Sequence, residues 1–284
     1  MSLLTIWKAN PMEIEIKLIQ QLVAIAGDGV LKDEGNASTE VREFLGAVPT
    51  GLLGRYLDQC LNAGFQDSGF VLQDIVNELG RRLGCEVKPG IYRGKVGAVG
   101  FDGIWTFPDG YCIVVESKTT DAYSIKLDKF AAYRSSLIKQ AALPEQSSIL
   151  IVVGRADTDG LEAQVRGSRH AWDIRLISAD KLLKLVEIKQ AADSKATIQK
   201  IRTVLTPLEL TRVDFIVDLL ATTAEDIKDT AVAEAVDEET EAEVAAGKKW
   251  TPVAFHDDVV ARVAEKLGTE FKKETRSLYA SING

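Results

Sequence analysis

The sequence predicts an α/β fold in which a mixed β-sheet is flanked by helices. Apolar residues recur at three- and four-residue steps between positions 71 and 83, which is the spacing of a helix. Three strand-like segments follow, and from residue 124 to 190 helical and strand-like segments alternate. The turn signal Pro108-Asp109-Gly110 separates the second and third strands, so these two strands are expected to pair antiparallel.

The elements are expected in the following order. Within the mostly helical residues 1–66, Pro11 starts a helix that continues to residue 24, and Thr50 caps another helix. Ser68 caps the helix that ends before Gly84. The remaining expected elements are strands at 87–92, 99–107 and 111–118, a helix at 124–143, a strand at 149–153, a helix at 161–169, a strand at 173–177 and a helix at 179–190.

These elements divide the chain into five parts. Residues 1–66 are an N-terminal helical region, and residues 67–190 are the α/β core. Residues 191–230 add a helical extension with Thr211 as a cap, and residues 231–247 form an acidic linker. Residues 248–284 are expected to be a partial C-terminal module with further helix, because the sequence ends in what looks like a turn.

The bulk composition excludes several protein classes. No apolar run approaches the roughly 18 residues that span a bilayer, and we expect neither a membrane segment nor a signal peptide. Three widely spaced cysteines argue against a disulfide framework and favour the reducing cytoplasm. The two histidines do not combine with the cysteines at a zinc-binding spacing. A hard cation held by carboxylates remains open.

The net charge of −8 is concentrated in one segment. Residues 224–247 hold nine acidic residues and one basic residue, Lys228, which accounts for the whole excess. The rest of the chain is therefore close to neutral, so the composition leaves a basic cleft open without indicating one.

The expected hairpin gathers three charged side chains. With Asp109 at the centre of the turn, Asp102 and Glu116 lie equally far from it and face each other, with Cβ atoms about 4.5–5.5 Å apart. Because side chains alternate along a strand, Lys118 shares the face of Glu116. Two adjacent carboxylates repel unless a cation lies between them, and Mg²⁺ is commonly held by one or two carboxylates. Lys118 would then orient or deprotonate a water molecule, or offset developing negative charge.

Asp109, in the Pro108-Asp109 pair of the turn, is a further acidic residue near these three side chains in the sequence. Seven positions separate Asp109 from Glu116, which is roughly 23 Å of extended strand. The two side chains are thus too far apart to share an ion, and we interpret Asp109 as a turn residue.

The same residues resemble the PD-(D/E)XK nuclease superfamily, which includes many restriction endonucleases. Asp102 matches the first acid of that family, and Glu116-Ser117-Lys118 matches its Glu-X-Lys. The family often carries a glutamate on the preceding helix, where this chain has Gln73, a departure that could hold a water molecule at the metal. Glu78 lies one turn further on. The resemblance covers residues 67–190 and implies a restriction-endonuclease-like fold.

What the resemblance implies is a Mg²⁺-dependent endonuclease that hydrolyses phosphodiester bonds of double-stranded DNA. Asp102 and Glu116 would bind the metal, Mn²⁺ could replace Mg²⁺, and Gln73 and Lys118 would complete the catalytic set. Since duplex cleavage takes two cuts, a homodimer through the N-terminal helices fits this activity.

Other interpretations stay open. The three charged residues could form a structural ion-pair cluster in a nuclease-like module that only binds nucleic acid or protein, or the enzyme could be a repair nuclease or junction resolvase. Lys126, Lys129 and Arg134 on the next helix are either phosphate contacts or a solvated face. His170, which has no neighbouring histidine, is interpreted as structural.

Overall fold

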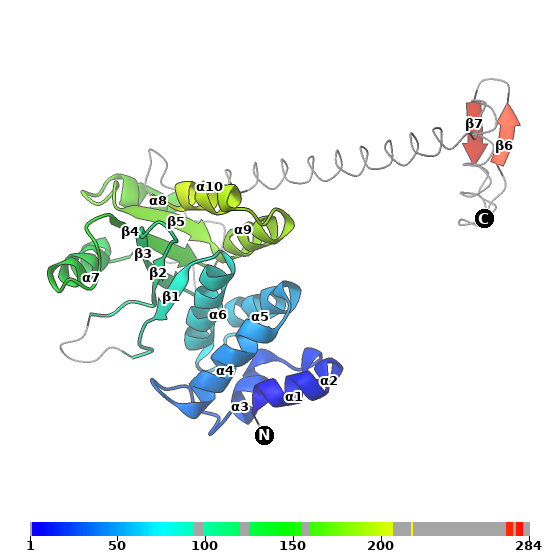
Figure 1. The fold of residues 1–284 in the computed structure, drawn as a ribbon, viewed down its shortest axis with the longest axis horizontal. Helices are drawn as coiled ribbons and strands as arrows, with labels where there is room; N and C mark the ends of the chain where they lie inside the picture. The colour runs from blue at the N-terminus through cyan, green and yellow to red at the C-terminus, as the bar shows by residue number, and fades with distance from the viewer. Residues whose placement is uncertain are drawn as a thin grey trace. The chain divides into compact units, whose positions relative to one another are not determined.

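The computed structural model describes residues 2–93, 99–119, 125–154 and 159–206, residue 217, and the backbone of residues 271–274 and 277–280. The chain divides into two compact units, Met1–Ala224 and Glu225–Gly284. The first contains an α/β domain with a mixed five-stranded sheet (Figure 1). In the second, β6 (Phe271–Glu274) pairs antiparallel with β7 (Ser277–Ala280), a hairpin that the sequence reasoning did not predict. The predicted cap Thr211 lies outside the described residues.

Six helices precede the sheet in the described part of the chain. They are α1 (Leu3–Ala9), α2 (Pro11–Glu15), α3 (Ile19–Ile25), α4 (Asn36–Ala47), α5 (Thr50–Asn62) and α6 (Ser68–Arg82). Five of them lie within residues 1–66, the region predicted to be helical, and α6 follows it. The sheet and its covering helices are β1 (Glu86–Pro89), β2 (Gly103–Thr106), β3 (Cys112–Lys118), α7 (Leu127–Lys139), β4 (Ser147–Val153), α8 (Asp159–Arg166), β5 (Ile174–Ser178), α9 (Ala179–Ala191) and α10 (Lys195–Leu205).

The strands lie in the order β1-β2-β3-β4-β5. β1, β2 and β3 pair antiparallel, whereas β3, β4 and β5 pair parallel, so the predicted mixed sheet is confirmed. The parallel strands need crossover connections, and α7 and α8 provide them. β4 is buried at every position, as the uninterrupted apolar run at 149–153 predicts for a central strand covered on both faces.

Each face of the sheet has its own apolar cluster. Trp105, Ile113 and Val115 face α6, α9 and the N-terminal helices. Ile104 and Val114, their neighbours in sequence, face the cluster formed with α7 and α8. Figure 1 shows α7 on one side of the sheet and α6 and α9 on the other. The N-terminal helices share the first cluster, so the boundary predicted at residue 66 falls between α5 and α6 without dividing the core.

Three local predictions were wrong. The helix expected from residue 11 to 24 is interrupted after Glu15, and α3 begins at Ile19. Asp67, with a φ of 64°, occupies the cap position that was predicted for Ser68. Pro49 occupies the cap position predicted for Thr50, whose hydroxyl accepts a 2.8 Å hydrogen bond from Arg82 instead. None of the described helices is long and apolar enough to cross a membrane.

The packing of α6 against β2 leads to a prediction on two glycines of the same helix. A Cβ at Gly80 would lie 2.4 Å from the Trp105 ring, whereas a Cβ at the exposed Gly69 would meet no atom within 4 Å. Gly80→Ala should therefore lower the free energy of unfolding by about 1–3 kcal/mol through overpacking. Gly69→Ala should leave it unchanged or raise it by up to about 1 kcal/mol. Urea unfolding measures both, and equal stability of the two variants would contradict the described packing.

Candidate active site at the open end of the hairpin

The hairpin has the predicted register. Ile104 pairs with Val114 and Trp105 with Ile113, which are the pairs expected for a turn centred on Asp109. The turn is closed by a 2.8 Å hydrogen bond from the Gly110 N–H to the Phe107 carbonyl. The predicted site residues therefore lie at the other end of the hairpin, where β2 begins and β3 ends.

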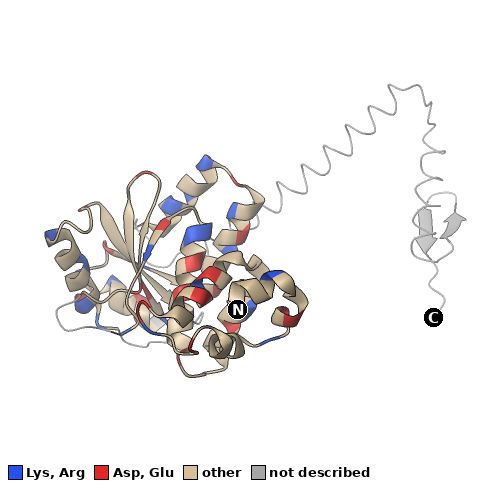
Figure 2. Ribbon diagram, turned by 60° about the horizontal axis from the view of Figure 1, so that its bottom comes forward, with Lys and Arg blue, Asp and Glu red and all other residues tan. Residues whose placement is uncertain are grey.

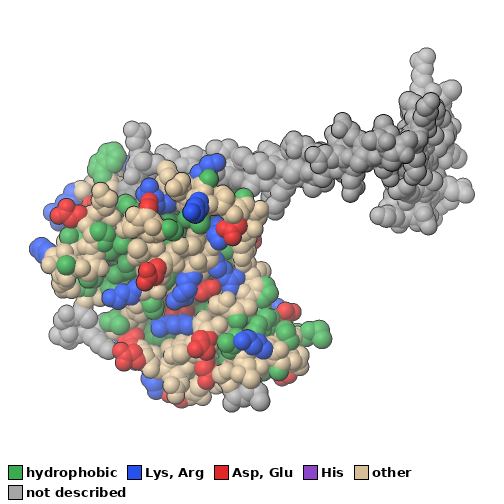
Figure 3. Space-filling model, in the orientation of Figure 1, with side chains coloured by type: hydrophobic (Ala, Val, Ile, Leu, Met, Phe, Trp, Pro, Cys, Tyr) green, Lys and Arg blue, Asp and Glu red, His purple; other side chains and the backbone are tan. Residues whose placement is uncertain are grey.

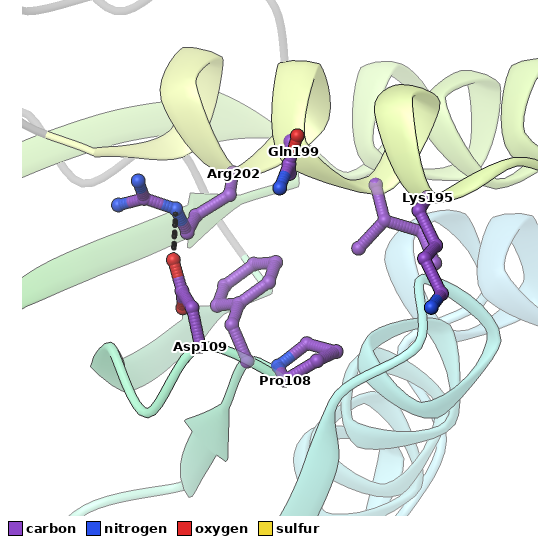
Figure 4. Close-up of a pocket in the computed structure, with 7 residues that line it drawn as sticks. Pro108, Asp109, Lys195, Gln199 and Arg202 are labelled. Carbon is purple, nitrogen blue, oxygen red and sulfur yellow. Dashed lines mark ion pairs between the residues drawn. The ribbon is translucent and has the colours of Figure 1, made fainter.

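Asp109 lies in the turn, away from that end. Its Oδ2 is 2.8 Å from the Arg202 Nε of α10, and this ion pair closes one side of a cavity of about 390 Å³ between the turn and α10 (Figure 4). The Arg202 guanidinium also lies over the Tyr111 ring, 5.3 Å from its centroid. Asp109 thus joins the turn to α10, in agreement with its interpretation as a turn residue.

Asp102 is the residue just before β2, and its carboxylate is held by β3. The Oδ2 atom accepts hydrogen bonds from the Ser117 backbone N–H at 2.6 Å and from the Ser117 Oγ at 2.7 Å. The sequence predicted that Asp102 faces Glu116, and the carboxylate in fact reaches one residue further along the strand. Both bonds to Ser117 engage Oδ2.

The backbone of Asp102 is fixed from α6. Its carbonyl oxygen accepts hydrogen bonds from Asn77 Nδ2 at 2.8 Å, from Gln73 Nε2 at 3.1 Å and from the Gly90 N–H at 2.8 Å. Asn77 also accepts a 3.1 Å hydrogen bond from the Trp105 indole N–H through its Oδ1. Two side chains one helical turn apart therefore determine where the start of β2 lies relative to α6.

Gln73 consequently touches the site through its amide nitrogen. This side chain donates to the Asp102 carbonyl, and its expected role of holding a metal-bound water stays a prediction. Asn77 was missed by the sequence reasoning. The signal for it is present, because Gln73 and Asn77 are polar residues four apart in an apolar helical pattern.

Glu116 and Lys118 lie on the α7 face of the sheet and form an ion pair with each other. They continue the row of Cys112 and Val114, which belong to the cluster under α7. The Lys118 ammonium also lies 5.5 Å from the centroid of the Phe130 ring on α7. The Glu116 side chain is 13% exposed and that of Lys118 is 33% exposed, so the glutamate is largely dehydrated while the amine reaches solvent.

Burial and mutual repulsion disfavour two negative charges here. Burial raises the pKa of Asp102, and the two hydrogen bonds from Ser117 act against this rise. Burial, followed by the charge of Asp102, raises the pKa of Glu116 to about 7, although Lys118 acts in the opposite direction. The pair therefore favours any bound group that adds positive charge between the two carboxylates.

Two further candidates, Glu78 and Arg134, are held by structural contacts. Glu78 pairs with Arg81 at 3.2 Å and with Arg82 at 3.0 Å, which directs it toward the N-terminal helices and away from Asp102. Arg134 bonds Ser147 at 3.0 Å and Asp173 at 3.2 Å, so it ties α7 to the β4 and β5 ends instead of presenting a phosphate contact. Of the two alternatives left open for Arg134, a phosphate contact and a solvated face, these contacts support neither.

The charge distribution is mixed around this domain. Figure 3 shows acidic and basic side chains interspersed over the face in view. Figure 2 shows basic positions on α7, where Asp128 is the one acidic residue of the helix. No group of three or more His, Cys, Asp and Glu side chains suited to a metal ion occurs in the part of the chain that the structure describes.

Comparison of the chain with models of known protein families and with curated protein sequences gives no match.

The raised pKa of Glu116 leads to a pH-dependent prediction. A carboxyl whose pKa is raised on folding contributes stability below its unfolded value, here near 4.5, and loses it as the pH rises through about 7. Glu116→Gln removes this loss. The variant should gain roughly 3 kcal/mol of unfolding free energy relative to the native protein between pH 4 and pH 8. Urea unfolding at several pH values measures the difference, and a difference independent of pH would refute the assigned burial.

Proposed function

We propose that this chain is a Mg²⁺-dependent endonuclease that hydrolyses phosphodiester bonds of double-stranded DNA, with a restriction-endonuclease-like core. The observation that carries the proposal is the convergence of Asp102, Glu116 and Lys118 at the open end of the β2–β3 hairpin. The resemblance of these residues to the PD-(D/E)XK superfamily gives the convergence its chemical interpretation. The mixed sheet with helices on both faces supports it.

The carboxylate pair fits a divalent cation of hard character. Asp102 and Glu116 would hold Mg²⁺, or Mn²⁺ in its place, because both supply oxygen ligands and both are disfavoured as neighbouring free anions. When bound, the ion supplies Lewis acidity and offsets the negative charge that develops on the phosphate. Ser117 keeps Asp102 oriented by its two hydrogen bonds, so the ligand oxygen is positioned before the ion arrives.

Lys118 is the remaining chemical group of the site. Its ammonium lies beside Glu116 and reaches solvent, where it would orient the attacking water or stabilise the charge of the transition state. Asn77 and Gln73 position Asp102, because their side-chain amides donate hydrogen bonds to its backbone carbonyl. The attack would displace the leaving oxygen in line and leave a 5′-phosphate, as the resemblance implies.

One observation favours a non-catalytic alternative. Lys118 already pairs with Glu116, as it would in a structural ion-pair cluster of a module that only binds nucleic acid or protein. Calorimetric titration with Mg²⁺ or Mn²⁺ separates the two functions. Binding that is lost in Asp102→Asn and in Glu116→Gln supports the nuclease, and absence of binding to the native protein supports the alternative. Panels of duplex, flap and junction DNA separate a restriction-type enzyme from a repair nuclease or junction resolvase.

We also propose that the enzyme acts as a homodimer in the cytoplasm. The three cysteines are free thiols, which suits a reducing compartment such as the cytoplasm.

The exposed apolar residues of the N-terminal helices support the dimer. Met12 and Ile16 are 77% and 80% exposed there, and Figure 3 shows hydrophobic side chains over the α1–α2 region. Analytical ultracentrifugation should give a dimer that Ile16→Lys dissociates, and a monomeric native protein would end this part of the proposal.

The catalytic role of Lys118 gives the main functional prediction. With Mg²⁺, the native protein should nick plasmid DNA, and Lys118→Ala should lower the rate by about 100-fold or more. Chelation of the metal should abolish nicking. Lys139→Ala is the matched control, because it removes the same charge from the exposed last turn of α7 and should cut at the native rate. Equal rates for Lys118→Ala and the native protein would contradict the assignment.

A further inference from the structure

A second cavity lies between the start of α7 and the end of α8. It has a volume of about 840 Å³, within the roughly 300–1,000 Å³ range of ligand sites. Lys126, Lys129 and Arg169 line it, and Asp128 is the one carboxylate among the described residues of its lining. Three cations against one anion make this cavity electropositive in a domain whose surface charges are otherwise mixed.

The single acid of the cavity is already engaged. Asp128 Oδ1 lies 2.8 Å from Arg169 and 2.8 Å from His170 Nε2, so it bridges the end of α8 to the start of α7. Lys126 and Lys129 form no ion pair with a carboxylate in the part of the chain that the structure describes. Lys129 lies over the Tyr133 ring, 5.3 Å from its centroid, so it has an aromatic neighbour but, among the described residues, no carboxylate that neutralises its charge.

The position of Lys129 connects the cavity to the candidate active site. After the larger effects of burial, Asp102 and Lys118, the charge of Lys129 still acts on the pKa of Glu116, so the two side chains lie within electrostatic reach. Phe130, the next residue, contacts Lys118 through its ring. Lys129 and Lys118 thus provide positive charge both at the cavity and at the hairpin end.

The cavity wall is also held firmly. The Gln164 side chain of α8 bonds both the N–H and the carbonyl group of Ile125, which fixes the backbone just before α7. No side chain caps the first turn of α7, so its backbone N–H groups add positive partial charge at the lysines.

We propose that this cavity binds phosphate groups of the DNA strand adjacent to the phosphodiester that reacts. Lys126 and Lys129 make the ionic contacts, and Asp128 holds Arg169 and His170 at the rim. The inference rests on the proposed nuclease function for its ligand, because neighbouring phosphates of one strand supply the repeated negative charge that the cavity and the active site would share.

Duplex binding without metal tests the inference apart from cleavage. The full chain is titrated against a short fluorescein-labelled duplex in the presence of chelator, at a series of salt concentrations. A double variant, Lys126→Ala with Lys129→Ala, should bind at least roughly tenfold more weakly at about 0.1 M salt. The slope of log affinity against log salt should become shallower by about 2, since two phosphate contacts are lost. Lys139→Ala, on the same helix outside the cavity, should match the native protein.

The outcomes distinguish this site from the proposed function. Native affinity and native slope in the double variant would overturn the cavity as a phosphate site, even if Mg²⁺-dependent cleavage is found. Absence of measurable duplex binding by the native protein would overturn it as well. If the lysines govern binding but the native protein cuts no DNA in Mg²⁺, the phosphate site stands and the nuclease proposal fails.

Discussion

The attachment of the Asp102 carbonyl to α6 is the contact on which the site geometry depends. One oxygen accepts three hydrogen bonds, two of them from the side chains of Gln73 and Asn77. The Gln73 and Asn77 amides are buried, which carries a desolvation cost. Their hydrogen bonds to the Asp102 carbonyl offset this cost. The same Asn77 accepts from the Trp105 indole, so β2 is fixed at two points along its length. The end of the strand is therefore set by the helix beneath it as well as by its partner strand.

This rigid end holds a charge arrangement that is unfavourable by itself. Asp102 cannot turn away from Glu116, because Ser117 holds its carboxylate with two hydrogen bonds. Burial then adds to the repulsion, and both acids have raised pKa values. A surface cluster could relieve such repulsion by side-chain rotation and hydration. Here the hydrogen bonds from Ser117 restrict that relief. The Lys118 ammonium offsets part of the negative charge through its ion pair with Glu116, and the cation that we propose would offset the rest.

How much the sequence could predict differs between the two halves of this site. The pairing of β2 residues with β3 residues could be predicted from the turn, because Pro108-Asp109-Gly110 sets the register of the hairpin. The alternation of side chains along each strand then determines which residues share a face of the sheet. The role of Asn77 lies in contacts to residues 25 and 28 positions away, which no local pattern encodes. The wrong helix caps have a related cause. Asp67 adopts the left-handed region and displaces Ser68 from the cap, and the Thr50 hydroxyl is engaged by Arg82.

The basic residues after the hairpin show why the composition alone could not predict which of them are placed to bind an anion. In the sequence Lys126, Lys129 and Arg134 are equivalent charges on one helix, but only the first two line the cavity. Arg134 is turned inward to Ser147 and Asp173, where its guanidinium serves the β4 and β5 ends. Under the proposed function, the two buried carboxylates would repel a phosphodiester, so the site would need positive charge within a few ångströms. Lys118 supplies it at the hairpin and Lys129 extends it along α7, which makes the acidic pair and the basic cavity parts of one electrostatic arrangement.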